Sequence, residues 1–391
     1  MSTTPAEPQK KRRKPFLWIV LSLVLVALLG AGGYLFMLNS AWNQAQTIEN
    51  AMPNEDGTVA TVDPVGEEEL KKLVEENVAV TEEIQNEETP EVSLEANITE
   101  DDTNGDGILD AVSGGQVTSR PVDAASTDIL LLGSDQRSGA AAARVSGARA
   151  DSIMVLHIPA DGSAAYLISI MRDTWVNIPG YGSAKVNAAL NYGGVALQVA
   201  TIEQLLGIRM DHVAEIDFEG FKALVDTLGG VDVKVPVGFT TSGATPYTFS
   251  AGVNSMNGTQ ALAFVRERYT FSNGDYQRVI NQRAFIRGVY SKLRSQGAMS
   301  SAASLLPVIQ SVAPYMSVDS GLTPSQIVGI AQPVLANGNT QLVTMTLPNA
   351  GTGWSWNGQS IVVLDSAATG AMSQALQTGT MSNFVATYGA D

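Results

Sequence analysis

The spacing of hydrophobic positions changes along the chain, and each spacing predicts a type of element. Short apolar runs bounded by turn residues are typical of buried strands. They occur at residues 128–133, 152–158, 165–170, 341–346 and 360–364. Helical patterns lie among them, at residues 195–206, 218–228, 258–265 and 276–294 and after the capping residue Thr323. A final helix is expected after residue 364. Mixed strands and helices predict an α/β sandwich with helices on both faces of the sheet.

One apolar stretch is long enough to cross a membrane. Residues 16–38 form a run of 23 residues without a charge, which as a helix rising 1.5 Å per residue exceeds a hydrocarbon core of about 30 Å. A cleavable signal peptide is the alternative, but its apolar region spans only about 7 to 15 residues. The basic run KKRRK precedes the span, so the positive-inside rule places the tail at residues 1–15 in the cytoplasm. The sequence thus predicts a single-pass anchor of the cell membrane with an extracytoplasmic domain.

The segment at residues 39–125 is predicted to be an acidic, flexible linker. It is rich in glutamate, poor in aromatic residues and interrupted by prolines, so it cannot bury enough apolar surface to offset the entropy lost on ordering. One motif inside it, DTNGDGILD at residues 102–110, resembles the calcium loops of dockerin and thrombospondin type 3 repeats. Ser113 stands where an EF-hand has its bidentate glutamate, which excludes a full EF-hand and leaves calcium binding open. The folded domain is expected at residues 126–385.

The charge of the chain is unevenly distributed. The whole chain carries a net charge of −16, but residues 49–110 hold 20 acids against two lysines, and residues 111–391 hold 18 acids against 16 basic residues, a net of −2. A nearly neutral domain without a basic recognition helix argues against nucleic acid as a partner. Cysteine is absent and only His157 and His212 offer imidazoles, so any chemistry rests on carboxylates, arginines and hydroxyls.

The densest group of candidate functional residues lies at residues 266–283, RERYTFSNGDYQRVINQR. Arg266 and Arg268 are expected at the end of one helix, and Asp275 opens the next. Arg278 and Gln282 follow Asp275 at i+3 and i+7, which stacks the three side chains on one helix face. Because guanidinium groups grip phosphate oxygens bidentately, the segment predicts a pyrophosphate site. A solvated basic helix is the alternative.

Polar groups also follow the predicted strands. Asp135 follows the first predicted strand and Asp151 precedes the second, so two carboxylates at neighbouring strand edges could share a divalent cation such as Mg²⁺. Ordinary turn and strand-capping roles are the alternative. The third strand runs into Arg172, and Lys185 follows in the motif KVNAALNYGG.

The order and spacing of these motifs resemble the LytR-CpsA-Psr family of extracytoplasmic phosphotransferases. The matching features over about residues 125–380 are LLLGSDQR, RADSIM, SIMRDTWV, KVNAALNYGG, DFEGFKALVDTLGGVDVKVP and NGTQALAFVRER followed by D-x-x-R-x-x-x-Q. The chain departs from the family at Met171, where proline is usual, and at Asn281, where arginine is common. The resemblance implies a three-layer α/β/α sandwich with a mixed central sheet.

The resemblance also implies a function. Family members transfer a glycopolymer linked to polyprenyl pyrophosphate onto a peptidoglycan acceptor through a phosphodiester bond, with the lipid tail in an apolar tunnel. The tunnel would use the helices at 195–206 and 276–294. Two alternatives remain open: a pyrophosphatase that uses water as acceptor, and a non-enzymatic, membrane-anchored regulator or lipid-binding scaffold.

Particular residues take roles by this resemblance. Asp135 and Asp151 would hold Mg²⁺ (or Mn²⁺), and Asp275 would orient the arginines. Either Asp275 or Asp135 would accept the proton of the sugar hydroxyl. The residues implied to bind the pyrophosphate are Arg172, Lys185, Arg266, Arg268, Arg278 and Gln282. Those implied in catalysis are Asp135, Asp151, Arg172, Arg266, Arg268 and Asp275.

Overall fold

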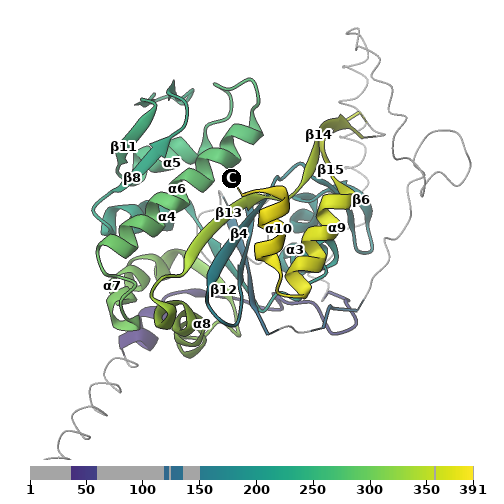
Figure 1. Cartoon of the computed structure of the whole chain (residues 1–391), viewed down its shortest axis with the longest axis horizontal. Helices are drawn as coiled ribbons and strands as arrows, with labels where there is room; N and C mark the ends of the chain where they lie inside the picture. Colours follow the sequence, from purple (N-terminus) through teal and green to yellow (C-terminus); the bar gives the residue numbers. More distant parts are fainter. Residues whose placement is uncertain (1–36, 60–118, 123–124, 135–149, 356–357, 391) are drawn as a thin grey trace, which may run out of the picture.

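A computed structural model describes residues 37–59, 119–122, 125–134, 150–355 and 358–390 (Figure 1). The predicted cytoplasmic tail, nearly all of the predicted membrane span and the motif at residues 102–110 lie outside these ranges. Within the described residues, no helix combines the length and the apolar character needed to cross a bilayer.

Seven strands form a mixed central sheet in the order β1-β12-β7-β2-β3-β4-β13. Their bounds are β1 (Gln46–Ile48), β2 (Thr127–Ser134), β3 (Ala150–Ile158), β4 (Ala164–Ile170), β7 (His212–Ile216), β12 (Met316–Asp319) and β13 (Gln341–Thr346). β7 runs parallel to β2, and β13 runs parallel to β4. β3 is antiparallel to both β2 and β4. The carboxyl ends of β2, β4, β7 and β13 therefore meet at one edge, where β3 begins.

The predicted strands are confirmed to within two residues. Every residue of β4 is buried, which explains why these strands read as continuous apolar runs: both faces of the sheet are covered. Helix boundaries also agree closely, as for α4 (Phe218–Thr227) and α5 (Gly258–Arg266). The mixed α/β class with a mixed central sheet is thus correct.

One face of the sheet is covered by α3 (Ala188–Leu206), α9 (Ser366–Gln377) and α10 (Met381–Tyr388) (Figure 1). In α3, Leu197, Ile202 and Leu206 are almost fully buried against strand residues such as Leu130 and Ile168. The apolar side of α3 is therefore part of the core, and a lipid tunnel along residues 195–206 stays a prediction.

A second core lies beside the sheet. It joins α4, α5 and α6 (Asp275–Ser295) to the pairs β8 (Val231–Val235) with β11 (Gly252–Met256) and β9 (Phe239–Thr240) with β10 (Thr248–Phe249). The rings of Phe239, Phe249 and Phe264 pack together in it, with centroids 5.4 to 5.7 Å apart. The sequence pattern did not distinguish this separate core from helices laid on the sheet.

α6 connects the two parts of the fold. Arg283 donates to the hydroxyl of Thr346, and Arg287 donates to that of Thr344 at 2.7 Å, so the helix is tied to β13. Arg283 is only 4% exposed. Arg283 and Arg287 are therefore structural residues, because their long side chains reach the sheet.

Two apolar helices are packed loosely. α7 (Ala302–Val312) leads through the short helix η1 (Ala313–Tyr315) to β12, and α8 (Pro324–Asn337) follows, with Thr323 capping it by accepting from the backbone N–H of Gln326. No described residue of α7 or α8 is buried. Both helices therefore keep apolar side chains only half covered.

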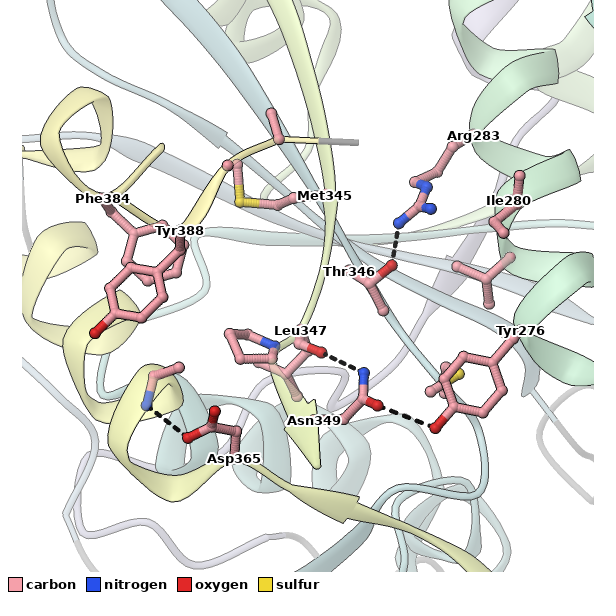
Figure 2. A pocket seen from close by; sticks show the side chains of 16 residues that line it. Tyr276, Ile280, Arg283, Met345, Thr346, Leu347, Asn349, Asp365, Phe384 and Tyr388 are labelled. Atoms are coloured by element: carbon pink, nitrogen blue, oxygen red, sulfur yellow. Dashed lines mark hydrogen bonds between the residues drawn. The ribbon is translucent and has the colours of Figure 1, made fainter. Parts of the chain in front are cut away.

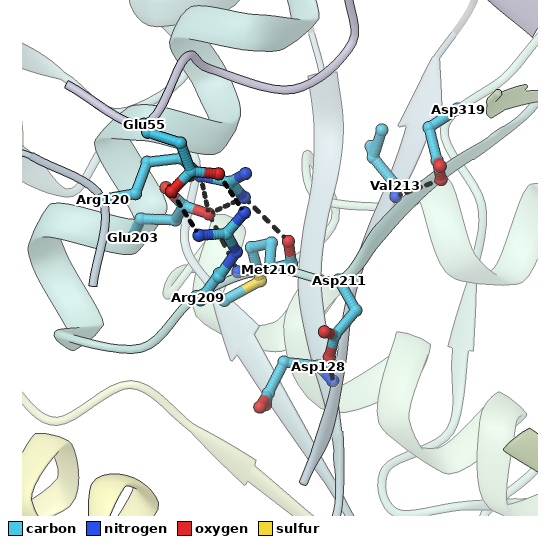
Figure 3. A network of polar contacts seen from close by, with 9 residues as sticks. All are labelled: Glu55, Arg120, Asp128, Glu203, Arg209, Met210, Asp211, Val213 and Asp319. Atoms are coloured by element: carbon cyan, nitrogen blue, oxygen red, sulfur yellow. Dashed lines mark hydrogen bonds and ion pairs between the residues drawn. The ribbon is translucent and has the colours of Figure 1, made fainter. Parts of the chain in front are cut away.

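Parts of the predicted linker belong to the folded domain. β1 extends the sheet alongside β12, and the indole of Trp42 donates to the carbonyl oxygen of Leu322 at 2.8 Å. Arg120 forms an ion pair with Glu203 of α3, and both side chains are at most 5% exposed (Figure 3). The linker prediction is thus wrong for residues 39–59 and 119–122, because a few apolar and charged anchors outside the acidic run order them. Residues 60–118 lie outside the described ranges.

Two hairpins flank the sheet edge where the strand ends meet. β5 (Trp175–Ile178) pairs with β6 (Gly182–Lys185), and β14 (Asn349–Trp354) pairs with β15 (Ser360–Leu364). The backbone N–H of Val362 donates to the carbonyl of Asp173 at 2.8 Å. This bond fixes the second hairpin to the turn that follows β4.

Candidate functional site

The turn between α5 and α6 is organised by the carboxylate of Glu267. This residue is 5% exposed and accepts backbone N–H bonds from Ser242 (2.6 Å), Arg268 (2.9 Å) and Thr270 (3.2 Å). Burial raises the pKa of Glu267, but these donors together outweigh that effect and leave the pKa below its ordinary value. An ionised buried carboxylate therefore fixes the backbone between Arg266 and Arg268.

Glu267→Ala is expected to lower the free energy of unfolding by about 1–3 kcal/mol, because several buried N–H groups lose their acceptor. It should also weaken pyrophosphate binding, since Arg268 loses its fixed backbone. Urea unfolding and the KM for a polyprenyl pyrophosphate donor measure the two effects. Glu267→Gln keeps one acceptor oxygen and should recover part of both. A stability loss with an unchanged KM would show that Glu267 supports only the fold.

Asp275 lies at the centre of an arginine cluster. It is the first residue of α6, as the sequence predicted. Its carboxylate lies 3.2 Å from Arg172 Nε, 3.2 Å from Arg278 Nη2 and 3.6 Å from Arg268 Nη1. The side chains of Asp275 and Arg278 are 16% and 6% exposed. Three guanidinium groups from three separate segments therefore converge on one partly buried carboxylate.

Asp173 extends this cluster toward β6. Its carboxylate lies 3.6 Å from Arg172 Nε and 3.2 Å from Lys185 Nζ. The turn that carries it is closed by the hydroxyl of Thr174, which donates to the carbonyl of Met171 at 2.6 Å. Met171 is 2% exposed, so the residue that departs from the family pattern is held firmly in place. The sequence motif contained Asp173, but no role was predicted for it.

Positive charge exceeds negative charge in this cluster. Four cations surround two carboxylates, which leaves a surplus of two positive charges. Burial raises the pKa of Asp275, but the charges of Arg278, Arg172 and Arg268 outweigh it, so the pKa lies below its ordinary value of 3.8. Asp275 is therefore ionised at neutral pH, which suits it to hold arginines and makes it a weak proton acceptor.

The other predicted members of the arginine segment are placed differently. Arg266 is exposed, and its guanidinium carbon lies 4.3 Å from the ring centroid of Phe218, the first residue of α4. Gln282 contacts the carbonyl of Val265 at 3.5 Å. Asn281 is fully buried and donates to the carbonyl of Phe264 at 3.4 Å. Asn281 therefore packs α6 against α5, and in this chain its position does not face the cluster.

The two predicted metal ligands can be followed only through the backbone. Asp135 lies outside the described residues, and the side chain of Asp151 does as well. β3 begins at Ala150, which pairs with Ser134, and Ser152 pairs with Gly133. Residue 151 therefore lies beside the end of β2. Within the described residues, no three His, Asp or Glu side chains gather in a way that could hold a metal ion.

A cavity of about 410 Å³ adjoins the arginine cluster (Figure 2). It is lined by Met171, Tyr276 and Val279, which are sequence neighbours of Arg172, Asp275 and Arg278. Further residues of α6, the end of β13, the first residue of β14, the start of α9 and residues from α10 form the remaining walls. The sequence pattern gave no sign of this cavity, because its walls come from distant segments.

The two histidines have structural partners. His157 is fully buried in β3 with Nδ1 2.8 Å from Asp128, and His212 lies 3.2 Å from Asp319. Both pairs are in the sheet and apart from the cluster around Asp275. This agrees with the expectation that neither imidazole takes part in the site.

Comparison with known proteins relates the whole site-bearing region to one family. Residues 84–378 match the family model described as the LytR_cpsA_psr family. The polyisoprenyl-teichoic acid–peptidoglycan teichoic acid transferase TagU of Bacillus mycoides is 36% identical over 219 residues, 56% of this chain and 67% of that protein. The probable cell wall biosynthesis protein LcpB of Corynebacterium glutamicum is 36% identical over 206 residues, 50% of this chain and 49% of that protein. The matches thus span between half and two thirds of these relatives.

The fold is similar to that of a solved structure as well. A protein from Streptococcus agalactiae superposes with a TM-score of 0.57 at 24% identity, covering 66% of this chain and 88% of that one. At this identity the likeness concerns the mixed α/β fold.

Proposed function

Because the chain belongs to the LytR-CpsA-Psr family, we propose that it transfers a polyprenyl-pyrophosphate-linked glycopolymer onto peptidoglycan. The observation that carries this proposal is the surplus of positive charge around Asp275. Converging guanidinium groups are suited to the oxygens of a pyrophosphate. The activity named for the TagU relative is a transfer of the same kind.

The proposed step is a displacement at phosphorus. The acceptor hydroxyl oxygen forms a bond to the phosphorus that carries the glycopolymer, and the bond from that phosphorus to the bridging oxygen breaks. Polyprenyl phosphate leaves with the electron pair, and the hydroxyl proton passes to a base. Arg172, Arg268 and Arg278 would neutralise the charge that develops on the phosphate oxygens. Lys185, Arg266 and Gln282 are proposed to border the same substrate.

Asp275 is the weaker of the two candidates for the base. Asp275 has a depressed pKa and three guanidinium neighbours, so it would accept a proton weakly at neutral pH. Its proposed role is to position the arginines.

Asp135 and Asp151 are also proposed to hold Mg²⁺ (or Mn²⁺). The β2–β3 register, which puts residue 151 beside the end of β2, supports this, and two carboxylates supply the hard oxygen ligands that Mg²⁺ prefers. When bound, the cation would add positive charge next to the substrate phosphates.

α7 and α8 offer the apolar surface for the polyprenyl tail. Their leucine and isoleucine side chains are only half-buried, and those of α8 cluster with Leu131 of the central strand β2. Burial of half-exposed apolar surface by a lipid tail is favourable by roughly 25 cal/mol per Å². The α3 side of the sheet has no comparable surface among its described residues.

We further propose that the chain is anchored in the cell membrane by residues 16–38, with a cytoplasmic N-terminus and an extracytoplasmic catalytic domain. The uncharged run and the preceding KKRRK support this arrangement. Protease added to cells stripped of their wall should degrade the catalytic domain. Complete protection of that domain would contradict the proposed orientation.

The transfer activity is tested with the full chain in detergent micelles. The donor is a polyprenyl pyrophosphate glycopolymer, and the acceptor is uncrosslinked peptidoglycan. We expect polymer joined to peptidoglycan and equimolar release of polyprenyl phosphate, and a large loss of both on chelation that is restored by Mg²⁺. Release of the lipid phosphate with acceptor present but no joined polymer would favour the pyrophosphatase. Donor binding without turnover at any metal concentration would favour the scaffold.

A further inference from the structure

The cavity beside the arginine cluster has the composition of a sugar site. Its volume of about 410 Å³ lies within the range of small-ligand pockets, roughly 300–1,000 Å³. The lining mixes the aromatic rings of Tyr276, Phe384 and Tyr388 with the polar groups of Thr346, Asn349 and Asp365. Rings that cover the C–H faces of a sugar, together with hydrogen-bonding groups for its hydroxyls, are what a saccharide requires.

Two adjoining faces of α6 connect the cavity to the phosphate cluster. Tyr276, Val279, Ile280 and Arg283 stand at i, i+3, i+4 and i+7 and line the cavity. The cluster uses the neighbouring positions one residue earlier, Asp275 and Arg278. Residues at i and i+1 are about 100° apart around a helix of 3.6 residues per turn. The first two turns of α6 therefore present the phosphate cluster and the cavity side by side.

The opposite walls supply stacking and hydrogen-bonding groups. Tyr388 is 53% exposed, and its ring stacks on Phe384 with centroids 4.7 Å apart. The hydroxyl of Tyr276 donates to Asn349 Oδ1 at 3.0 Å across the cavity (Figure 2). Asp365 caps α9 by accepting from the backbone N–H of Ala368 at 2.9 Å. The rings and amides are thus held in place before any ligand binds.

A polyprenyl tail fits this cavity poorly. Arg283, Thr346, Asn349 and Asp365 are among the residues that line it, and covering such polar groups with hydrocarbon without new hydrogen bonds costs free energy. The donor pyrophosphate is already accounted for by the cluster around Asp275. The remaining substrate components, the donor glycan and the acceptor, are both saccharides that match the lining. The acceptor is the one whose hydroxyl must reach the phosphorus beside the cluster.

We propose that this cavity is the subsite for the acceptor saccharide of peptidoglycan, which places the accepting sugar between α6 and α10. The inference rests on the proposed transfer function. Tyr388 provides the stacking surface, and Asn349 is the principal hydrogen-bonding group.

Tyr388→Ala tests the subsite in the full chain. The variant should raise the KM for a peptidoglycan tetrasaccharide acceptor roughly tenfold, which corresponds to 1.4 kcal/mol. The KM for the donor and the slow release of lipid phosphate to water should remain within twofold of wild type. Asn349→Ala should act in the same direction. Tyr181→Ala is the matched control, because Tyr181 is 39% exposed and stacks on Tyr192 at 5.2 Å outside the cavity lining.

The outcomes separate this inference from the transfer function. Normal transfer by wild type with an unchanged acceptor KM in both cavity variants overturns the subsite and leaves the function intact. A raised donor KM with an unchanged acceptor KM assigns the cavity to the donor glycan and also overturns the proposal. If the wild-type protein binds donor, metal and acceptor but joins no polymer to peptidoglycan, the proposed function itself is wrong.

Discussion

Asp275→Asn is expected to lower the transfer rate by on the order of 10²–10³, the effect of losing one preorganised electrostatic group. Asparagine has nearly the shape of aspartate but no charge. Arg172, Arg268 and Arg278 would then repel one another without the carboxylate that holds them at 3.2 to 3.6 Å. Single-turnover transfer with saturating donor measures the loss.

The pH dependence of this variant distinguishes a positioning residue from a base. The pKa of Asp275 is lowered by its arginines, so its contribution to stability is fully present above about pH 4 and is lost as the pH falls through the folded-state pKa. Asp275→Asn should therefore flatten the acid limb of the stability profile below pH 4. The neutral limb of the rate profile should keep its midpoint, because another group accepts the proton.

Asp226→Asn serves as the control for the same chemical change. Asp226 accepts one backbone N–H, from Gly258 at 2.8 Å, and lies in α4. The transfer rate of the Asp226→Asn variant should stay within twofold of the wild-type rate. A shift of the neutral midpoint in Asp275→Asn would instead identify Asp275 as the base.

Glu203→Ala is expected to destabilise the fold by about 3–5 kcal/mol, because it leaves the buried guanidinium of Arg120 without its charged partner. The Glu203 carboxylate accepts from Arg120 Nε at 3.0 Å and from the backbone N–H of Met210 at 2.9 Å. Both side chains of the ion pair are at most 5% exposed. Equilibrium urea unfolding of the full chain in detergent gives the change in free energy.

Glu55→Ala provides the comparison on the same surface. Glu55 pairs with Arg209 at 2.6 Å, but its side chain is 77% exposed (Figure 3). Exposed pairs contribute little to stability, since water screens them, so we expect a much smaller loss than for Glu203→Ala. Equal destabilisation by the two variants would show that the segment around Arg120 is not held by its buried ion pair.

Part of the site could be predicted because its residues are close in sequence. Asp275 and Arg278 lie one helical turn apart, and a helix that begins at Asp275 brings them together whatever surrounds it. Gln282 follows on the same helix face but contacts the carbonyl of Val265, because one helix face can meet two different neighbours. Arg172 and Lys185 joined the site only through a resemblance in motif order, since periodicity carries no information about contacts between distant segments.

The predicted linker shows what amino-acid composition cannot predict, namely single contacts that order a segment. Acidity and prolines correctly describe an average property of residues 39–125, but order depends on a few anchors. Trp42, Arg120 and the three residues of β1 find partners more than 80 positions away. Averages over a segment do not detect such single contacts.

The sequence by itself determined the strands β2, β3, β4, β13 and β15, the main helices, the mixed α/β class and the Asp275–Arg278 pair, because hydrophobic period and helical spacing are local properties. Only the tertiary structure decided which helices share a core, that Glu267 fixes the backbone beside Arg268, and that Asp173 extends the arginine cluster. It also decided that Asn281 and Arg283 are buried and that a cavity lies beside α6. These features require segments far apart in the chain to meet. Their meeting is governed by the packing of whole surfaces, which no local spacing encodes.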